Sequence, residues 1–163
     1  MLTVPTLVDR PAQTYVAIRE KVTIPFTPVI DRVMPEVAAW LQARGVERFG
    51  PAVFKYNVID MPRLDVEMGF APPGPLKGEG RVLVGTLPAG RYATLTHWGH
   101  YDRLMDATAV LIGWAKEKGI VWDSSTAPDG EHFDSRFELY PNGPMDEPDP
   151  EKWETQIFIK VRG

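Results

Sequence analysis

Apolar and polar residues alternate along several short segments of the chain, and this spacing predicts β-strands. Two longer segments, residues 28–44 and 101–118, instead carry apolar residues at helical spacing and are each followed by a glycine that can end a helix. Thr27 is predicted to cap the first helix, and Pro35 to kink it or delay its start. The predicted strands cover residues 13–22, 52–59, 64–70, 82–87, 92–98, 135–139 and 154–161.

A segment rich in proline and glycine, residues 71–80, divides these elements into two halves. If the strand at 82–87 is set aside, each half reads strand, helix, strand, strand. The chain is therefore predicted to form one α+β domain, residues 1–163, built from two architectural modules of about 13–70 and 82–162. We expect antiparallel sheets with the two main helices on one side, and a concave surface at the module junction on the opposite side.

One strand near the carboxyl end displays a carboxylate beside an aromatic ring. Alternation places Phe137 and Leu139 on one of its faces, and Arg136, Glu138 and Tyr140 on the other. If that polar face lines the concave surface, Glu138 is an anionic anchor for a flat, often cationic organic molecule. If the face is solvated, Glu138 is an ordinary surface charge.

Other aromatic residues are placed to join this acid. Phe54 and Tyr56 share one face of their strand, where they either line the same groove or form core under the first helix. Trp153 enters the final strand and either folds over the groove edge or caps the core. Together with Tyr140 they would form an aromatic box around Glu138, whose pKa would rise in a dry site and fall beside a bound cation.

Composition excludes several classes of function. The chain has no cysteine and only three histidines, so thiol chemistry is absent and neither a metal site nor a cofactor is expected. A formal charge of −4 argues against direct nucleic-acid binding, because phosphate recognition relies on clustered Lys and Arg. No apolar segment is long enough for a membrane span and no targeting segment is present, so we expect a cytoplasmic protein.

Two polar groups receive a structural interpretation. His97, His100 and Asp102 flank the turn before the second helix, where capping and packing account for them. Asp65 and Glu67 share the polar face of one strand and are expected to be exposed. As an acid and base pair they would have to face the same pocket as the acid on the later strand.

Several segments together resemble the GyrI-like small-molecule-binding domain, which also forms the effector-binding half of some AraC-type and MerR-type multidrug regulators. The likeness covers almost the whole chain. The matching segments are GTLPAGRYATLTHWGHYD at 85–102, RFELY at 136–140, EPDPEKWET at 147–155, and the shorter stretches 50–56 and 64–70.

This resemblance implies a duplicated strand-helix-strand-strand (SHS2-like) fold with a ligand groove where the modules meet. It also implies that Glu138 contacts aromatic or cationic ligands. Gln156 stands where many relatives carry an acid, so the second acid of those relatives is missing here. The residues that the resemblance places in the aromatic wall are Tyr56, Trp153, Tyr140, Phe54 and Trp98.

Three hypotheses of function follow. The first is a stand-alone cytosolic protein that binds planar, lipophilic or cationic xenobiotics, without a DNA-binding helix-turn-helix of its own. Some stand-alone relatives hydrolyse cyclopropane-containing genotoxins, so the second is a cofactor-independent hydrolase with Glu138 as general base or water-orienting group. The third is an interaction module of the gyrase-inhibitor type, which would bind a protein partner and need no ligand in the groove.

Overall fold

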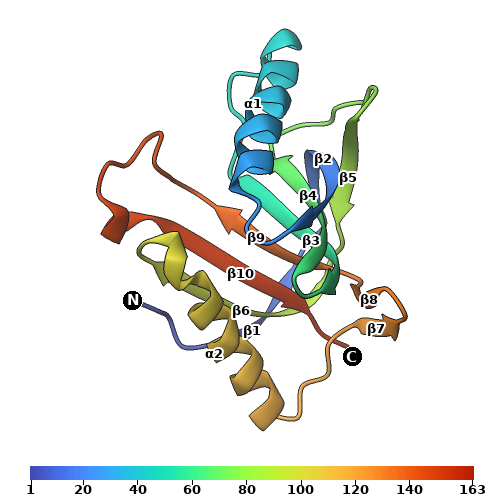
Figure 1. The fold of residues 1–163 in the computed structure, drawn as a ribbon, viewed down its shortest axis with the longest axis vertical. Helices are drawn as coiled ribbons and strands as arrows, with labels where there is room; N and C mark the ends of the chain where they lie inside the picture. The colour runs from blue at the N-terminus through green and yellow to red at the C-terminus, as the bar shows by residue number, and fades with distance from the viewer.

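Ten strands form one continuous antiparallel sheet, and two α-helices pack against it (Figure 1). The computed structural model describes all residues, 1–163. The helices are α1 (Thr27–Ala43) and α2 (Leu104–Glu117), with short 3-10 turns η1 (Tyr101–Arg103) and η2 (Pro150–Lys152). The strands are β1 (Thr6–Arg10), β2 (Gln13–Thr23), β3 (Ala52–Asp60), β4 (Arg63–Phe70), β5 (Val82–Leu87), β6 (Gly90–Trp98), β7 (Ser124–Ala127), β8 (Gly130–Phe133), β9 (Arg136–Tyr140) and β10 (Glu154–Lys160). This arrangement confirms the predicted α+β class.

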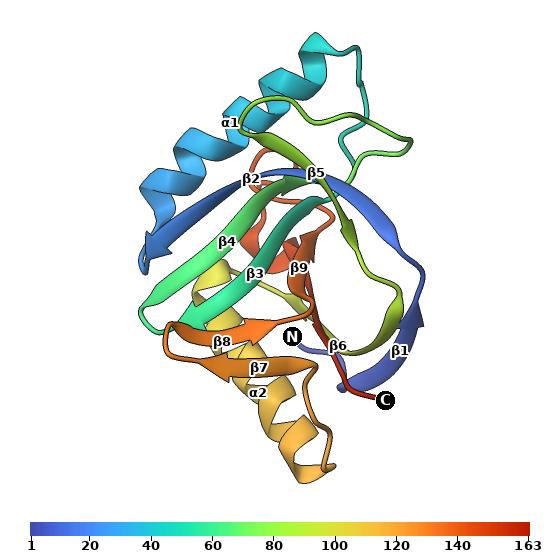
Figure 2. The same ribbon diagram turned by 90° about the vertical axis from the view of Figure 1, so that its right-hand side faces the viewer.

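The strand order is β1-β6-β10-β9-β3-β4-β2-β5, and the β7–β8 hairpin adds to the side of β3. Strands of the first and second halves of the chain pair at several places, among them β1 with β6 and β2 with β5. In the middle of the sheet β9 pairs with β3, with Glu138 opposite Phe54 and Phe137 opposite Lys55. Figure 2 shows that the sheet curls strongly, so that its two ends approach each other. The sheet therefore has an inner face, which the curl encloses, and an outer face.

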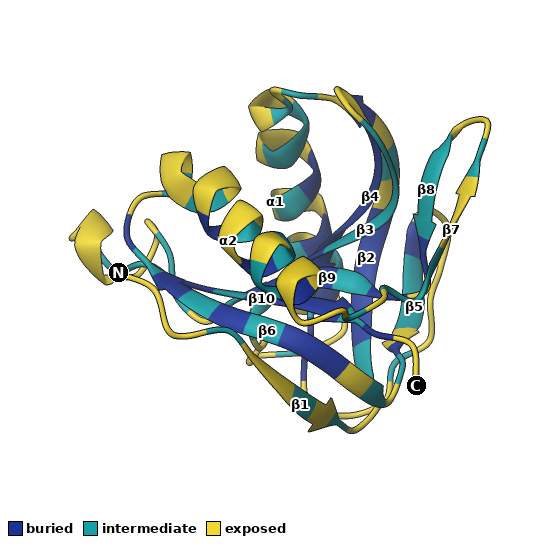
Figure 3. Cartoon of the chain, turned by 90° about the horizontal axis from the view of Figure 1, so that it is seen from below, coloured by how far each residue is buried: buried dark blue, intermediate teal, exposed yellow.

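Both helices cover the outer face, as Figure 3 shows. Helix α1 packs on β2 and β4, where Val33, Val37 and Leu41 are fully buried. Helix α2 packs on β6, burying Leu111 against a second cluster that includes Ile157. Burying an aliphatic side chain of this size contributes about 1.5–3 kcal/mol. A third cluster, with Phe137 among its members, fills the inner face and needs no helix.

The start of α1 differs from the prediction. Its N-cap position is Phe26, whose side chain makes no capping hydrogen bond, and Thr27 is the first helical residue. Pro28, in the first turn, supplies a backbone angle that suits a helix start. Pro35 lies inside the helix without delaying its start. The missing backbone donor at Pro35 is tolerated because the apolar face of α1 is buried on either side of it.

Three strands were not predicted, and two consecutive strands do not pair with each other. Strand β1 pairs with β6, with Thr6 opposite Thr94, and the short β7–β8 hairpin pairs with β3. Strands β5 and β6 follow each other in sequence but do not pair, because β5 adds to β2 while β6 adds to β10. Strands β1, β7 and β8 are short, with 5, 4 and 4 residues, so local alternation gives little signal of them. Alternation also does not show which strands pair when the partners lie far apart along the chain.

Candidate functional site

Glu138 lies at the centre of the outer face, between the areas that the two helices cover. Its neighbours across the sheet are Phe54 on β3 and Ile157 on β10. Phe54 packs in the cluster under α1, and Ile157 packs in the cluster under α2. The expectation that Glu138 points to a concave surface opposite the helices is therefore wrong. The inner face of β9 belongs instead to Phe137 and Leu139, which fill the curl of the sheet.

The carboxylate of Glu138 is buried and makes hydrogen bonds with only one of its oxygens. The side-chain hydroxyls of Tyr56 and Tyr140 both donate to Oε1, at 2.7 and 2.6 Å. Oε2 accepts no hydrogen bond from the protein, although Glu138 is only 8% exposed. Burial raises the pKa of Glu138, and the two phenols and the nearby Arg136 oppose that rise. The site thus contains a largely buried acid with one oxygen that accepts no hydrogen bond from the protein.

The two phenols that hold Glu138 remain neutral donors. The pKa of Tyr56 and the pKa of Tyr140 are raised well above the ordinary value, first by burial and then by the neighbouring carboxylate. Tyr56 comes from the first half of the chain and Tyr140 from the second. Glu138 is therefore held from both halves at once, which the alternation of either strand alone could not show.

A continuous series of aromatic rings extends from this acid toward the start of α2. Tyr140 contacts Phe54 at a ring-centroid distance of 5.3 Å and meets Tyr101 edge-on at 5.6 Å. Tyr101 stacks on Trp153 at 4.9 Å, and Trp153 also lies 5.4 Å from the ring of His100. Tyr101 was not predicted to belong to the site. Its place beside the turn glycine in the segment WGHYD was the only signal in the sequence.

The structure brings together most, but not all, of the residues predicted for the site. Glu138, Tyr56, Tyr140 and Phe54 are in direct contact, so Phe54 is both a core residue and a neighbour of the acid. Trp153 is linked to them through the stacked ring on η1, and its indole nitrogen donates to the backbone oxygen of Glu147 at 2.7 Å. Trp98 makes no ring contact with these residues.

Trp98 lies on the other face of β6 from the neighbouring His97. Leu95 and His97 share a face with the cluster under α2, and Trp98 follows one residue later, opposite Glu154. No ring contact joins Trp98 to the aromatic series around Glu138. The structure therefore does not place Trp98 with the other predicted site residues.

The rings around Glu138 nearly close the site. A surface hollow of about 580 Å³ lies elsewhere, and no charged side chain lines it. Its lining residues are Ala12, Gln13, Thr14, Ala71, Pro72, Pro73, Gly74 and Pro75. No group of three or more His, Asp or Glu side chains is placed to hold a metal ion. Neither helix has the length and apolar character needed to cross a membrane.

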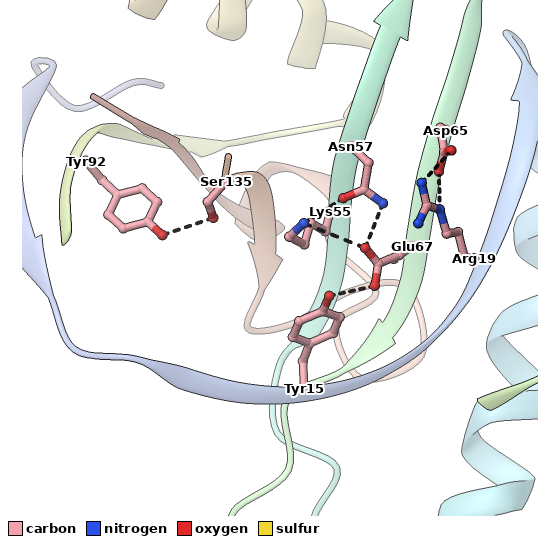
Figure 4. Close-up of polar contacts among 8 residues, drawn as sticks. All are labelled: Tyr15, Arg19, Lys55, Asn57, Asp65, Glu67, Tyr92 and Ser135. Atoms are coloured by element: carbon pink, nitrogen blue, oxygen red, sulfur yellow. Dashed lines mark hydrogen bonds and ion pairs between the residues drawn. The ribbon is translucent and has the colours of Figure 1, made fainter. Parts of the chain in front are cut away.

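A second buried acid, Glu67, occupies the inner face (Figure 4). It is 6% exposed and accepts hydrogen bonds from the hydroxyl of Tyr15 at 2.6 Å and from Nδ2 of Asn57 at 2.7 Å. Nζ of Lys55 lies 3.7 Å from the same carboxylate and donates to Asn57 at 2.6 Å. Both oxygens of Glu67 are therefore satisfied, and burial together with this carboxylate raises the pKa of Tyr15.

Asp65 is buried on the same face as Glu67 and is held by two hydrogen bonds from Arg19, at 2.7 and 2.8 Å. Burial alone would raise the pKa of Asp65, but the hydrogen bonds and charge of Arg19 outweigh it and lower that pKa. The prediction that Asp65 and Glu67 are exposed is wrong, because the curl of the sheet encloses their face. They cannot act with Glu138, which lies on the outer face.

Solved structures with the same fold include proteins of several descriptions. The C-terminal domain of EcmrR matches with a TM-score of 0.73 and 23% identity, covering 97% of this chain and 96% of that one. In the EcmrR–DNA complex, this chain covers only 57% of the longer EcmrR chain. SAV2435 bound to tetraphenylphosphonium matches with a TM-score of 0.61 and 14% identity, covering 98% of this chain and 94% of that one.

A protein described as a hydrolase from Listeria innocua also matches, with a TM-score of 0.60 and 13% identity, over 97% of this chain and 91% of that one. At these identities the likeness establishes the fold. No curated protein sequence matches this chain significantly. A family model does match, over residues 3–162, and it describes the GyrI-like small-molecule-binding domain. Because that match spans nearly the whole chain, the protein belongs to the GyrI-like small-molecule-binding domain family.

Proposed function

We propose that the protein binds lipophilic aromatic cations at Glu138, between the two helices. The observation that carries this proposal is the free Oε2 of a buried carboxylate surrounded by aromatic rings. The site would be a groove at the junction of two strand-helix-strand-strand modules, where β9 pairs with β3. The relative bound to tetraphenylphosphonium, a lipophilic aromatic cation, supports the same class of ligand.

The physical argument rests on the cost of leaving Glu138 ionised without a partner. A cation about 4 Å from the carboxylate would gain roughly 4 kcal/mol at an effective dielectric constant of 20, before its own desolvation is counted. A ligand with diffuse charge loses little hydration, and each aromatic face adds about 0.5–2 kcal/mol. Lipophilic cations therefore fit this site better than small hydrated ions.

Entry of such a ligand requires the aromatic rings to move. Tyr101 and Trp153 stack on each other outside Tyr140, and neither is anchored within a regular helix or a long strand. We propose that these two rings swing away from Tyr140 and then pack on the ligand. The core clusters beneath the two helices would stay in place, because their side chains are buried on all sides.

The test compares tetraphenylphosphonium with triphenylphosphine oxide, a neutral molecule of similar shape, by isothermal titration calorimetry. In Glu138→Gln we expect the cation to lose tenfold or more in affinity and the neutral compound to lose roughly threefold at most. The control is Glu67→Gln, which alters a buried acid on the inner face and should leave the affinity for both compounds unchanged. Equal losses for both compounds in Glu138→Gln would count against the anionic anchor.

A second candidate function, hydrolysis of a strained cyclopropanoid electrophile, is favoured by the raised pKa of Glu138. A carboxylate whose pKa is raised binds a proton more strongly than one with an ordinary pKa, and is therefore the stronger general base when it is ionised. Incubation with a cyclopropanoid compound and mass spectrometry of the product tests this directly. Repeated turnover that disappears in Glu138→Gln, while binding of the compound persists, would identify a hydrolase; saturable binding without product would leave the binding function alone.

A further inference from the structure

Two buried polar atoms without hydrogen-bond partners lie side by side on the outer face. They are Nδ1 of His97 and Oγ1 of Thr155, whose residues are 3% and 0% exposed. His97 on β6 is directly opposite Thr155 on β10, so their side chains project from the same face as neighbours. Buried polar atoms in native proteins nearly always have partners. The molecule contains four such unpartnered side-chain atoms, and two of the four meet here.

This pair lies in the same row of the sheet as the aromatic residues of the Glu138 site. Ile157 on β10 is opposite Glu138, and Thr155 precedes it by two residues, so both project from the outer face. The same register, carried one residue beyond the pair of Gln156 and Leu139, places Thr155 beside Tyr140. His97 is one strand further away. With strands about 4.8 Å apart, His97 lies roughly 10 Å from the β9 strand.

The aromatic rings of the site pass over the same end of β10. Trp153 precedes Thr155 by two residues and shares its face, and its ring stacks on Tyr101. Burial lowers the pKa of His97, and the positive amino terminus and Arg103 act in the same direction. The ring is therefore neutral, and Nδ1 can donate or accept according to its tautomer. A hydroxyl such as that of Thr155 can also do either.

We propose that Thr155 and His97 form a hydrogen-bonding subsite next to the Glu138 anchor, and that the protein prefers ligands with two functional ends. One end would be an aromatic cation at Glu138. The other would be an uncharged polar group, such as a hydroxyl, about 10 Å from the charge. This inference rests on the proposed function, because the same movement of Tyr101 and Trp153 would open both parts of the site.

The test uses two triphenylphosphonium cations with a biphenyl arm, one of them with a hydroxyl at the far end of that arm. In the wild-type protein we expect the hydroxyl to raise affinity roughly fivefold to tenfold, as one hydrogen bond would. In Thr155→Val the gain should disappear, while the cation without the hydroxyl binds as tightly as it does to the wild type. Valine has nearly the same shape as threonine and removes an unpartnered hydroxyl, so this variant should fold.

The matched control is Thr96→Val, on β6 but on its other face, which should keep the full gain. A second readout is the ¹⁵N resonance of His97 Nδ1, which should shift with the hydroxylated cation and stay in place with the other. A hydroxyl gain that is absent in the wild type, or that survives Thr155→Val, overturns the inference while the Glu138 anchor stands. Failure of both cations to bind overturns the anchor and the subsite together.

Discussion

One carboxylate oxygen of Glu138 accepts hydrogen bonds from the protein, and the other accepts none. Oε1 receives hydrogen bonds from two phenols that come from different halves of the chain, so it helps to join those halves. Oε2 is left without a donor in a place where an ionised carboxylate is poorly solvated. A residue chosen only for stability would not be left in this state, because apolar replacements of buried, incompletely paired acids are often neutral or stabilising.

This environment predicts how stability depends on pH. Burial raises the pKa of Glu138 in the folded protein above its ordinary value of 4.5. The folded state therefore holds the proton more tightly than the unfolded chain, so the associated stability is present below pH 4.5 and is lost as pH rises through the folded-state pKa. In Glu138→Gln this loss should disappear, and the variant should be the more stable protein at neutral pH. Thermal unfolding of both proteins across this pH range measures the difference.

The control for this pH experiment is Glu117→Gln, in the exposed last turn of α2, which should follow the wild-type pH profile. A Glu138→Gln protein whose stability falls with pH as steeply as that of the wild type would show that another group carries the effect. The acids whose folded-state pKa is lowered, such as Asp65, act in the opposite direction and are unchanged in both proteins.

At the scale of elements, η1 and the segment before β10 together form the cover of the site. Tyr101 lies in η1 and Trp153 directly follows η2, so each ring is carried by a short turn. Asp102 lies in η1, and Asp149 is the N-cap residue of η2. The side chain of Asp149 accepts a hydrogen bond from the backbone nitrogen of Glu151. Short turns have few buried contacts and open more easily than the helices behind them.

The stacking of Tyr101 on Trp153 should be measurable as a coupling energy. Aromatic pairs contribute about 0.5–1.5 kcal/mol beyond the area they bury. We therefore expect Tyr101→Ala and Trp153→Ala to be non-additive by about 1 kcal/mol in a double-mutant cycle followed by urea unfolding. Both single variants should also bind tetraphenylphosphonium more weakly than the wild type. Additive effects on unfolding would show that the two rings do not stabilise each other in the unliganded protein.

Local patterns in the sequence identified most helices and strands. They did not identify which face of the sheet the helices cover and which face the curl encloses. Alternation correctly placed the side chains of Glu138 and Phe137 on opposite faces of β9, because successive side chains of a strand point to opposite sides. It could not tell which face the helices cover, since that depends on how distant strands pair and curl. The same limit explains Glu67, a polar residue on an alternating strand that the curl of the sheet encloses.

The candidate site was predictable where one strand or motif carried it. Glu138 and Tyr140 come from the same five-residue strand, and Phe54 and Tyr56 from another. Tyr101 was missed because its partner, Trp153, comes from a different part of the chain and only tertiary packing brings the two rings together. Trp98 was expected in the site because its segment matches the family, yet its register places it on the other face of β6.

At the scale of the whole molecule, two buried acids lie on opposite faces of one sheet and differ in how many of their carboxylate oxygens accept hydrogen bonds. Glu67 on the inner face has both oxygens satisfied, by Tyr15 and Asn57, with Lys55 close by. Glu138 on the outer face has one oxygen satisfied. A fully paired buried network rigidifies a fold, whereas a partly paired group leaves capacity for a ligand. The curl of the sheet thus separates a structural acid, Glu67, from the acid that we propose binds the ligand, Glu138.

This separation predicts opposite effects for the same chemical change at the two positions. In Glu67→Gln the new amide would face the donors Asn57 and Lys55, so we expect a loss of about 1–3 kcal/mol in the free energy of unfolding with little change in cation affinity. In Glu138→Gln we expect equal or higher stability at neutral pH and at least tenfold weaker binding. Urea unfolding and calorimetric titration of tetraphenylphosphonium, applied to both variants, measure the four quantities. If Glu67→Gln abolished cation binding without loss of stability, the inner face and not the outer one would hold the ligand.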